Sequence, residues 1–460
     1  MRVHPAGPRS GELAHEHGLG APPSDLNALD PAVWPVGMTR APGGHLLLRG
    51  HDVRDLVAEH GSPAFLLDEA DFRGRCAAYH DAFPGADVYY AAKAFLTVAV
   101  ARWVQEEGLR LDVCTGGELA VALRAEVPGE RILFHGNNKS TAELRVALDA
   151  GVGRIVVDSF DEIERLAVLC ADRPRPQPVL VRATVGVEAH THEFIATAHE
   201  DQKFGFSLAD GQVHEAVRRV LAAPGLELLG LHSHIGSQIF DTAGFEVAAH
   251  RAVGALAELR DEHGRELPEL NLGGGLGIAY VTGDDPLVPA EIGRSLRSIV
   301  ERECAGYGLQ VPHLAVEPGR AIAGPGTVTV YEVGTVKPVE GLRTYVSVDG
   351  GMSDNVRTAL YDADYTVTLA SRSSDAAPML SRVVGKHCES GDVVVKDAWL
   401  PADLAPGDLL AVAATGAYCR SMASTYNHVP RPPVVAVTGA GTRVLLRRET
   451  PEDLMSLDAG

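Results

Sequence analysis

Residues 109–171 read LRLDVCTGGELAVALRAEVPGERILFHGNNKSTAELRVALDAGVGRIVVDSFDEIERLAVLCA, and two patterns alternate along them. Short runs rich in β-branched and apolar residues predict strands, whereas segments with apolar residues three and four apart predict helices. Ser140 and Asp161 are residue types that often begin helices, and we expect each to begin one here. The expected strands cover 109–114, 131–136 and 154–159, and the expected helices cover 117–125, 140–150 and 161–171.

The same alternation continues on both sides of this stretch. Further strands are expected at 86–92, 178–184, 226–236, 268–275 and 313–319, which gives eight in all. An open doubly wound α/β sheet also alternates strands with helices, but eight strands favour a (β/α)8 barrel of the TIM type over residues 67–325. Polar or glycine residues close nearly every strand, at the end where barrel enzymes build their sites. They are Lys93, Thr115, His135, Asp158, Arg182, His234, Gly273–Gly275 and Glu317.

The pattern changes after the barrel. Between residues 326 and 450, strand-like runs follow one another with few long helices, which predicts an all-β, Greek-key-like domain followed by a tail at 451–460. Residues 1–40 are rich in proline, glycine and histidine, and we expect an extended arm there. Residues 41–66 are expected to pack with the β domain, although they could instead supply the barrel with an extra strand.

Composition limits the classes of partner. The 460 residues include 41 basic and 61 acidic side chains, for a net charge of −20. Such a field repels polyanions, so we expect neither nucleic acid nor an anionic membrane surface as a partner. The apolar runs are too short to span a membrane, and the amino terminus lacks the apolar core of a signal peptide. The six cysteines form no CxxC pair, and we expect a soluble, cytoplasmic protein with reduced thiols.

Features at the strand ends indicate one kind of cofactor. Lys93 follows two small alanines and is expected to be desolvated, which would lower the pKa of its amine and make it nucleophilic towards a carbonyl. The run NLGGGLG (271–277) lets the backbone approach a phosphate, although a tight turn would also explain it. Glu317 could pair with a ring nitrogen, or it could be a structural acid. An amine, a phosphate loop, an acid for a ring nitrogen and a stacking ring together describe a site for pyridoxal 5'-phosphate.

A metal site is the competing interpretation. His232 and His234 would share one side of a strand, and His190 and His192 have the same spacing. Because no third ligand at helical spacing accompanies them, we expect no metal.

Longer motifs around these residues resemble one known family. In this order, YYAAKAF, FHGNNKS, GVEAHTHEFIATAHEDQKFGFS, GLHSHIGSQ, LNLGGGLGIAY, EPGR, DGGMSDNVRTALYDADY, CESGD and GAYCRSMASTYN are similar to motifs of the diaminopimelate decarboxylases. That family belongs to the alanine-racemase-like fold group of pyridoxal phosphate enzymes. The resemblance implies decarboxylation of meso-2,6-diaminopimelate at its D-centre to L-lysine and CO2, the last step of lysine biosynthesis. Cys114, where the family more often has serine, is a departure from the pattern.

The resemblance also implies roles at the cofactor. Lys93 would hold it covalently, His234 would stack on its ring, and Glu317 would keep the ring nitrogen protonated. The phosphate would be held by Ser237 and by Gly273, Gly274 and Gly275, with Gly319 nearby, and Tyr418 would also reach the cofactor. The catalytic group would be Lys93, His234 and Cys388, the last of which would protonate the α-carbon.

The distal end of the substrate would have its own contacts. Its carboxylate would be held by Arg320, Arg357 and Tyr361, its ammonium by Glu389, and Tyr418 would also contact the substrate. Cys388 and Glu389 lie in CESGD, which in this family enters the partner subunit's site, so a homodimer with active sites shared across its interface is implied.

Other functions stay open at this point. A decarboxylase of another amino acid would have no use for Arg357, and a racemase of the same fold group would leave CESGD unexplained. A non-catalytic protein that binds pyridoxal phosphate would typically be the barrel alone. The long segment 187–206 between the fifth and sixth strands is a candidate lid.

Overall fold

The computed structural model describes residues 20–186 and 203–460. The chain forms two compact units. The barrel unit consists of residues 73–277 and 286–322, and the sheet unit contains the chain up to residue 72 together with 278–285 and 323–460.

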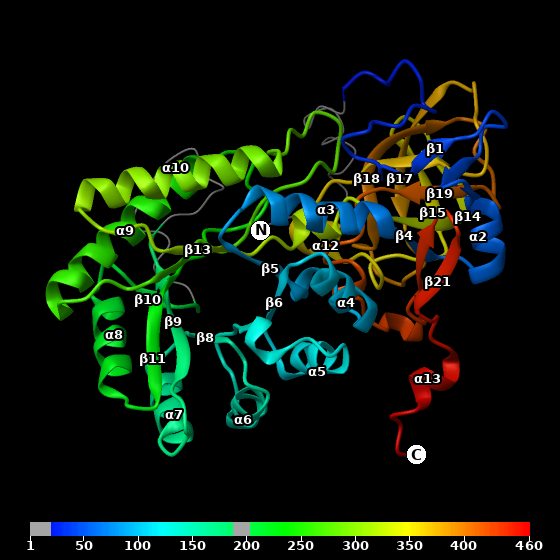
Figure 1. Ribbon diagram of the computed structural model, residues 1–460. Coiled ribbons are helices and arrows are strands. Elements are labelled where there is room, and N and C mark those ends of the chain that lie inside the picture. The colour runs from blue at the N-terminus through cyan, green and yellow to red at the C-terminus, as the bar shows by residue number, and fades with distance from the viewer. Residues whose placement is uncertain (1–19, 187–202) are drawn as a thin grey trace. The chain divides into compact units, whose positions relative to one another are not determined.

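Eight parallel strands, several of which are labelled in Figure 1, form the barrel unit, and their pairings close into a ring. Neighbouring strands pair in the order β5-β6-β7-β8-β9-β11-β12-β13, and β13 pairs with β5, which closes the ring. The predicted (β/α)8 barrel is therefore confirmed, and the open sheet is excluded. The short β10 (Phe206–Ser207) adds to β9 outside the ring. The barrel strands are β5 (Asp87–Ala91), β6 (Arg110–Val113), β7 (Ile132–Phe134), β8 (Arg154–Val157), β9 (Gln177–Thr184), β11 (Leu226–His232), β12 (Glu269–Asn271) and β13 (His313–Val316).

Helices follow the strands, and short polar side chains begin several of them. Ser140 begins α6 as predicted, and its side chain and that of Glu143 form a reciprocal capping box. The prediction for Asp161 was wrong, because Ser159 caps α7 and Asp161 falls in the first helical turn. An acidic side chain is favourable there because it faces the positive end of the helix dipole. The helices are α3 (Glu69–Ala82), α4 (Val98–Glu106), α5 (Gly116–Arg124), α6 (Thr141–Asp149), α7 (Phe160–Cys170), α8 (Gln212–Ala222), α9 (Ala243–His263), α10 (Pro289–Tyr307) and the short α11 (Arg320–Ala323), with 3-10 turns η1 (Ala92–Ala94) and η2 (Gly129–Arg131).

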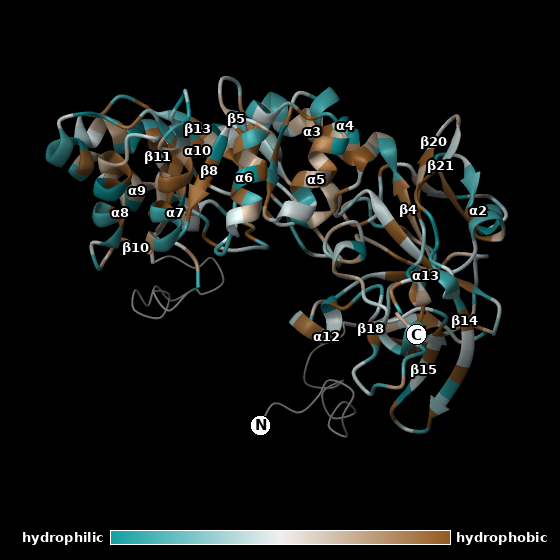
Figure 2. Cartoon of the chain, turned by 90° about the horizontal axis from the view of Figure 1, so that it is seen from below, coloured by the Kyte–Doolittle hydropathy of each residue, from teal (hydrophilic) through white to brown (hydrophobic). Residues whose placement is uncertain are grey.

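Apolar side chains fill the interior of the barrel. Tyr89, Leu133, Val156, Leu180 and Ala315 come from five different strands and form one cluster of buried residues. Figure 2 shows strands of the barrel in brown, with teal positions on the helices around them. This packed interior leaves the ends of the strands as the place where polar side chains can gather.

The sheet unit is built on one long strand. The first half of β14 pairs with β4 and β19, and its second half pairs with β15. The β15–β17 and β4–β20 pairs are parallel, and the other pairs of this sheet are antiparallel. In spatial order the strands are β18 (Val393–Pro401), β17 (Pro378–Val384), β15 (Arg343–Val348), β14 (Thr327–Val339), β4 (Ala64–Asp68), β20 (Val434–Thr438) and β21 (Gly441–Leu446), with β19 (Leu409–Val412) and β16 (Val367–Leu369) off this path.

Residues from before the barrel complete the sheet unit. β4 lies between β14 and β20, so the segment before the barrel adds its strand to this sheet and not to the barrel. Val33 and Trp34, within the range expected as an extended arm, are buried in the core of the unit. The remaining elements are β1 (Met38–Arg40), β2 (Leu46–Leu48), β3 (His51–Asp52), α2 (Val53–His60), α12 (Arg357–Tyr361), α13 (Pro451–Met455), and 3-10 turns η3 (Arg420–Met422) and η4 (Tyr426–His428).

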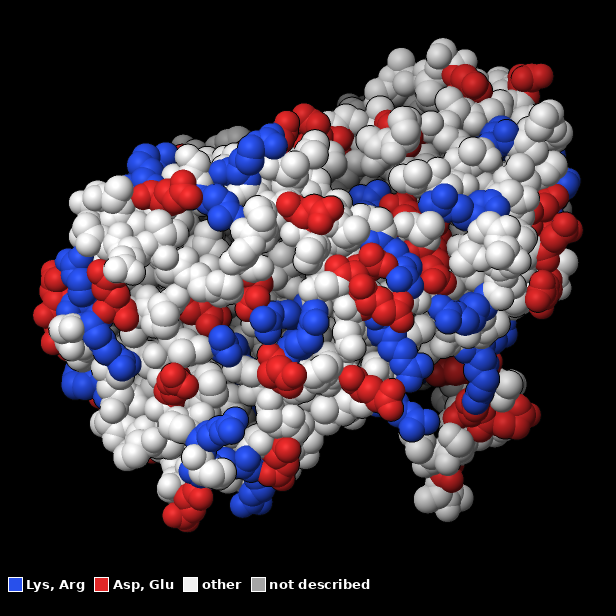
Figure 3. All heavy atoms as spheres, in the orientation of Figure 1, with Lys and Arg blue, Asp and Glu red and all other residues white. Residues whose placement is uncertain are grey.

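The distribution of charged side chains and the composition of the helices can also be described. On the face shown in Figure 3, basic and acidic side chains lie interspersed. In the described part of the chain, no helix combines the length and the apolarity that a membrane crossing requires.

Candidate functional site

Polar side chains meet where the barrel strands end. Lys93 follows β5, His135 follows β7, and Glu317 follows β13. His234 comes two residues after β11, and the glycine run 273–275 begins two residues after Asn271, the last residue of β12. Because all strands of a parallel barrel end at the same rim, residues far apart in sequence become neighbours there.

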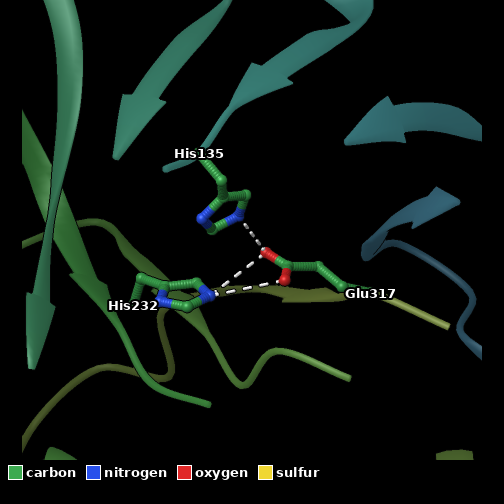
Figure 4. A group of neighbouring side chains, drawn as sticks. All are labelled: His135, His232 and Glu317. Atoms are coloured by element: carbon green, nitrogen blue, oxygen red, sulfur yellow. Dashed lines mark hydrogen bonds and ion pairs between the residues drawn. The ribbon is translucent and has the colours of Figure 1, made fainter. Parts of the chain in front are cut away.

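Glu317 is the centre of this group (Figure 4). The ring of His135 hydrogen-bonds its Oε1 through Nε2 at 2.8 Å, and Nδ2 of Asn271 donates to the same oxygen at 2.8 Å. Nε2 of His232 lies 3.3 Å from Oε1 and 3.4 Å from Oε2. All four side chains are buried. Several polar groups thus fix the position of one buried carboxylate.

The charges of this group are set by burial and by neighbouring side chains. Burial would raise the pKa of Glu317, but the imidazoles of His135 and His232 outweigh it and hold the pKa well below the ordinary value. Burial lowers the pKa of His135 to about 3, so this ring is neutral. Burial, and then the charge of Glu317, raise the pKa of Asp112 well above its ordinary value. The site thus holds two carboxyl groups whose pKa values are shifted in opposite directions, a separation typical of functional sites.

The glycine run has no room for side chains. A Cβ on Gly274 would lie 2.1 Å from the carbonyl oxygen of Glu317, and one on Gly273, whose φ is +69°, would lie 2.5 Å from the carbonyl oxygen of Ser233. The amide of Gly274 donates to Nδ1 of His234 at 3.3 Å. The close approach of backbone to backbone makes glycine necessary here. A glycine backbone without side chains also provides the kind of cradle that a phosphate needs.

The other barrel residues expected near the cofactor also lie at this rim. Nη2 of Arg320 donates a 2.8 Å hydrogen bond to Oγ of Ser237. A Cβ on Gly319 would lie 2.9 Å from that of Ala91, so Gly319 lets the end of β13 pack against the turn that carries Lys93. Burial, and then the positive charge of Lys93, lower the pKa of His234 well below its ordinary value, so this ring is neutral.

The expectation that Lys93 is desolvated was wrong. Its side chain is exposed, because it lies in the short turn η1 at the rim and not inside the barrel. Its charge nevertheless acts on Asp112 and His234, so the amine belongs to the electrostatic environment of the site.

Three other strand-end residues have structural contacts. Thr115 caps α5 by accepting a hydrogen bond from the amide of Glu118. Asp158 accepts one from the amide of Gly205 at 2.7 Å and lies 3.5 Å from Nη1 of Arg182.

The predicted substrate residues of the sheet unit fall into a buried and an exposed group. Arg357 is buried, and its Nε has no hydrogen-bond partner within the described residues. Tyr361, one helical turn later on α12, is 61% exposed. Cys388 and Glu389 are exposed, and Glu389 accepts a hydrogen bond from the amide of Gly391 at 3.2 Å. Tyr418 is half-buried with a φ of +61°, a backbone conformation that costs energy in a residue with a side chain.

Two residues of the site were not predicted from the sequence, and a third was misjudged. Asp112 lies between Leu111 and Val113, and Asn271 lies between Leu270 and Leu272; the contrast with these apolar neighbours was the available signal. His232 was judged to lack a third ligand, yet His135 and Glu317 bring their ligand-type atoms to within 4.8 Å of it. The partners come from other strands of the barrel, which helical spacing could not reveal. His190, His192 and most of the candidate lid lie outside the described residues.

Comparisons with known proteins agree with this arrangement. Residues 69–324 match the family described as "Pyridoxal-dependent decarboxylase, pyridoxal binding domain". The chain is 57% identical to diaminopimelate decarboxylase of Mycobacterium leprae over 470 aligned residues, which cover all of both chains. It is 59% identical to that of Mycobacterium bovis over 95% of this chain and 99% of the relative. The chain belongs to the diaminopimelate decarboxylases.

A solved structure of the family shares the fold. Diaminopimelate decarboxylase from M. jannaschii, in complex with L-lysine, aligns with a TM-score of 0.86 and 28% identity over 92% of this chain and 98% of that chain. The predicted family is confirmed, and with it a carboxy-lyase that depends on pyridoxal phosphate and decarboxylates diaminopimelate to lysine. The residues of this diaminopimelate decarboxylase fit the cofactor, because the glycine run provides a backbone cradle and the ionised Glu317 provides an acceptor for a protonated ring nitrogen.

Proposed function

We propose that this diaminopimelate decarboxylase acts on the D-centre of the meso isomer, and that the residues at the barrel rim hold its cofactor. Lys93 would hold it through the amine, and Ser237 with Gly273–Gly275 would bind the phosphate, which backbone amides suit. When bound, pyridoxal phosphate takes up the electron pair left by the departing CO2. The low pKa of Glu317 supports its role opposite the ring nitrogen, since an ionised carboxylate accepts a hydrogen bond from a protonated nitrogen and also balances its positive charge.

The neutral state of His234 supports the role assigned to it. A neutral imidazole can stack on an aromatic ring without adding a second positive charge beside Lys93. The hydrogen bond from the amide of Gly274 to Nδ1 fixes which nitrogen accepts, and so fixes the orientation of the ring.

One observation carries the choice of substrate. Arg357 is a buried cation whose Nε–H has no acceptor among the described residues. A buried donor without an acceptor is costly, and a carboxylate of the substrate would supply one. Diaminopimelate has a distal carboxylate, whereas ornithine and lysine do not. Arg320 and Tyr361 would join Arg357, and Glu389 would bind the distal ammonium with Tyr418 nearby.

We also propose a homodimer whose subunits complete each other's sites, with Cys388 delivering the proton to the α-carbon. Support comes from the exposure of Cys388 and Glu389, and from Leu360 and Tyr361, which are 54% and 61% exposed on α12. Leu360 and Tyr361 are neighbours in the chain, and contiguous exposed apolar side chains commonly mark an interface. Reduced thiols at all six cysteines support a cytoplasmic location.

The shared site can be tested by mixing two inactive variants. Lys93→Ala removes the cofactor amine, and Cys388→Ala removes the proton donor. If sites are shared, an equal mixture of the exchanged subunits should regain about one quarter of the wild-type activity, because half of the dimers would carry one intact site of two. A mixture that stays inactive after verified subunit exchange would contradict the shared site.

The substrate proposal is tested by lysine formation from meso-diaminopimelate, with ornithine and L-lysine as parallel substrates. We expect turnover of diaminopimelate with little of the others. Arg357→Ala should raise the KM for diaminopimelate about hundredfold, since a buried charged hydrogen-bonding pair is lost. Lys337→Ala, at an exposed position on β14, is the control. An unchanged KM in Arg357→Ala would refute the assignment of Arg357.

A further inference from the structure

Two tyrosines of the sheet unit fix the side chain of Arg357. Its guanidinium carbon lies 4.7 Å from the ring centroid of Tyr280 and 5.6 Å from that of Tyr365. Its Nη1 donates a 2.6 Å hydrogen bond to Oη of Tyr365. All three side chains are buried. Because a free arginine side chain has many rotamers, these contacts determine where the positive charge lies.

The hydroxyl of Tyr365 has a second neighbour. Its Oη lies 3.5 Å from Sγ of Cys419, which is fully buried. A guanidinium only donates hydrogen bonds, so Oη accepts from Arg357 and its own proton can point to the sulfur. Burial, and then the nearby Cys419, raise the pKa of Tyr365 well above its ordinary value, so the hydroxyl keeps this proton. Cys419 directly follows Tyr418, and one hydroxyl thus connects Arg357 to a second predicted substrate residue.

Tyr280 reaches this cluster from a distant part of the sequence. It lies in the segment 278–285, between β12 and α10 in the chain, yet it belongs to the sheet unit. Its carbonyl oxygen accepts a 2.8 Å hydrogen bond from Oγ1 of Thr366. The rings of Tyr280 and Tyr365 meet edge to face, with centroids 5.2 Å apart and planes at 79°. This geometry is favourable for aromatic pairs, so each ring supports the other against Arg357.

We propose that Tyr365, supported by Tyr280, is a positioning residue that makes the enzyme selective for a substrate with a distal carboxylate. Tyr365 occupies one nitrogen of the guanidinium and leaves Nε–H of Arg357 for the substrate. An arginine that is already ordered loses less entropy when it binds a carboxylate, so the selectivity comes from preorganisation. This inference rests on the proposed role of Arg357.

The test compares a ligand that has the distal carboxylate with one that lacks it. In the holoenzyme, KM and kcat are measured for meso-diaminopimelate, and the inhibition constant is measured for 1,5-diaminopentane, which has both amines and no carboxylate. Tyr365→Phe should raise the KM for diaminopimelate about tenfold, as expected for a lost hydrogen bond to a charged group. The kcat and the inhibition constant of 1,5-diaminopentane should stay within about twofold of the wild-type values. Tyr280→Leu should act in the same direction.

Each outcome separates the inference from the proposed function. Tyr345→Phe, on β15 of the same unit, removes a hydroxyl outside this cluster and is the matched control. Thermal melting of every variant shows whether it folds. If Tyr365→Phe does not fold, the test uses Tyr280→Leu. An unchanged KM in both tyrosine variants, with a raised KM in Arg357→Ala, would overturn the inference and leave the proposed function standing. An unchanged KM in Arg357→Ala would overturn both. Equal rises in the KM for diaminopimelate and the inhibition constant of 1,5-diaminopentane would show general loosening of the site and would also overturn the inference.

Discussion

Nε2 of His135 lies 2.8 Å from Oε1 of Glu317, although the two residues are 182 positions apart in the sequence. His135 follows β7 and Glu317 follows β13, and β5 and β6 stand between these strands in the barrel. The contact therefore crosses the rim between strands that are not neighbours. It joins a neutral donor ring to the one carboxylate whose ionisation the proposed chemistry requires.

Replacement of His135 should change the acid limb of the pH profile. Burial raises the pKa of Glu317, and His135 lowers it. In His135→Phe the lowering by His135 is lost, so the pKa of Glu317 rises from its low native value. Glu317 is then protonated as the pH falls through this higher pKa, and activity is lost at a higher pH than in the wild type. We expect kcat near neutral pH to fall about tenfold to hundredfold, as for other supporting residues of active sites.

His135→Gln keeps an N–H donor and is the matched control, which should recover part of kcat. The absorbance spectrum of the bound cofactor gives a second readout, because it responds to protonation of the ring nitrogen. A kcat–pH profile and a spectrum that are the same in His135→Phe and in the wild type would contradict the role of this contact.

A side chain at Gly274 should disrupt the rim. A Cβ there would lie 2.1 Å from the carbonyl oxygen of Glu317, and both backbones are fixed by the barrel. Gly274→Ala should therefore lower the unfolding free energy by about 1–3 kcal/mol and weaken cofactor binding. Gly74→Ala is the control, because Gly74 is exposed within α3 with no atom near its Cβ position, and it should raise stability by about 1 kcal/mol. Thermal melting and cofactor titration measure both effects, and equal behaviour of the two variants would refute the steric argument.

Sequence patterns were sufficient for the barrel but not for the contacts inside the site. Short apolar runs that alternate with helical segments revealed the barrel strands, because each strand needs a run of residues that can be buried. The positions of Glu317 and His234 then followed from the ends of their strands. The partners of Glu317 were not predictable in this way. His135, Asn271 and His232 reach it only because the ring closes, and linear spacing carries no information about that closure.

Predictions from neighbouring residues in the sequence also failed where the three-dimensional environment determines exposure, helix capping or packing. Lys93 lies at the expected strand end, yet it is exposed, since exposure depends on how the rim opens and not on its two alanine neighbours. Asp161 has the composition of a helix cap, but Ser159 has the extended backbone that capping needs. The packing of Tyr280 against Arg357 joins segments 77 positions apart, and no motif marked Tyr280 for such a role.

Asp354 should make stability depend on pH near neutrality. Burial raises its pKa to about 7, although the side chain accepts a hydrogen bond from Tyr331. A carboxyl whose folded pKa is raised stabilises the native state fully at low pH, and this contribution is lost as the pH rises from the unfolded pKa to the folded one. The unfolding free energy should fall by about 4 kcal/mol between roughly pH 4 and pH 7 from this group. Asp354→Asn should flatten that part of the curve in chemical denaturation, and a slope equal to that of the wild type would contradict the assignment.

The buried ion pair of Lys139 and Glu162 provides a last prediction, about stability instead of catalysis. Nζ of Lys139 lies 2.7 Å from Oε1 of Glu162, and both side chains are 1% exposed. The ammonium also donates to the carbonyl oxygens of Gly136 and Val156, so it ties the loop that follows His135 to β8. Lys139→Met leaves a buried carboxylate without its cation and should cost about 3–5 kcal/mol of unfolding free energy.

The loss in Lys139→Met should depend on pH in a defined direction. Burial already raises the pKa of Glu162, and Lys139 opposes that rise. Without Lys139 the folded pKa rises further above the unfolded value, so the destabilisation is greatest at high pH and shrinks as Glu162 takes up a proton on acidification. The double variant Lys139→Met with Glu162→Gln removes the buried charge and should recover part of the loss, whereas Lys337→Met, at an exposed lysine, should leave stability nearly unchanged. Urea unfolding at several pH values measures all three; a loss in Lys139→Met that is the same at every pH would mean that the uncompensated charge of Glu162 is not its cause.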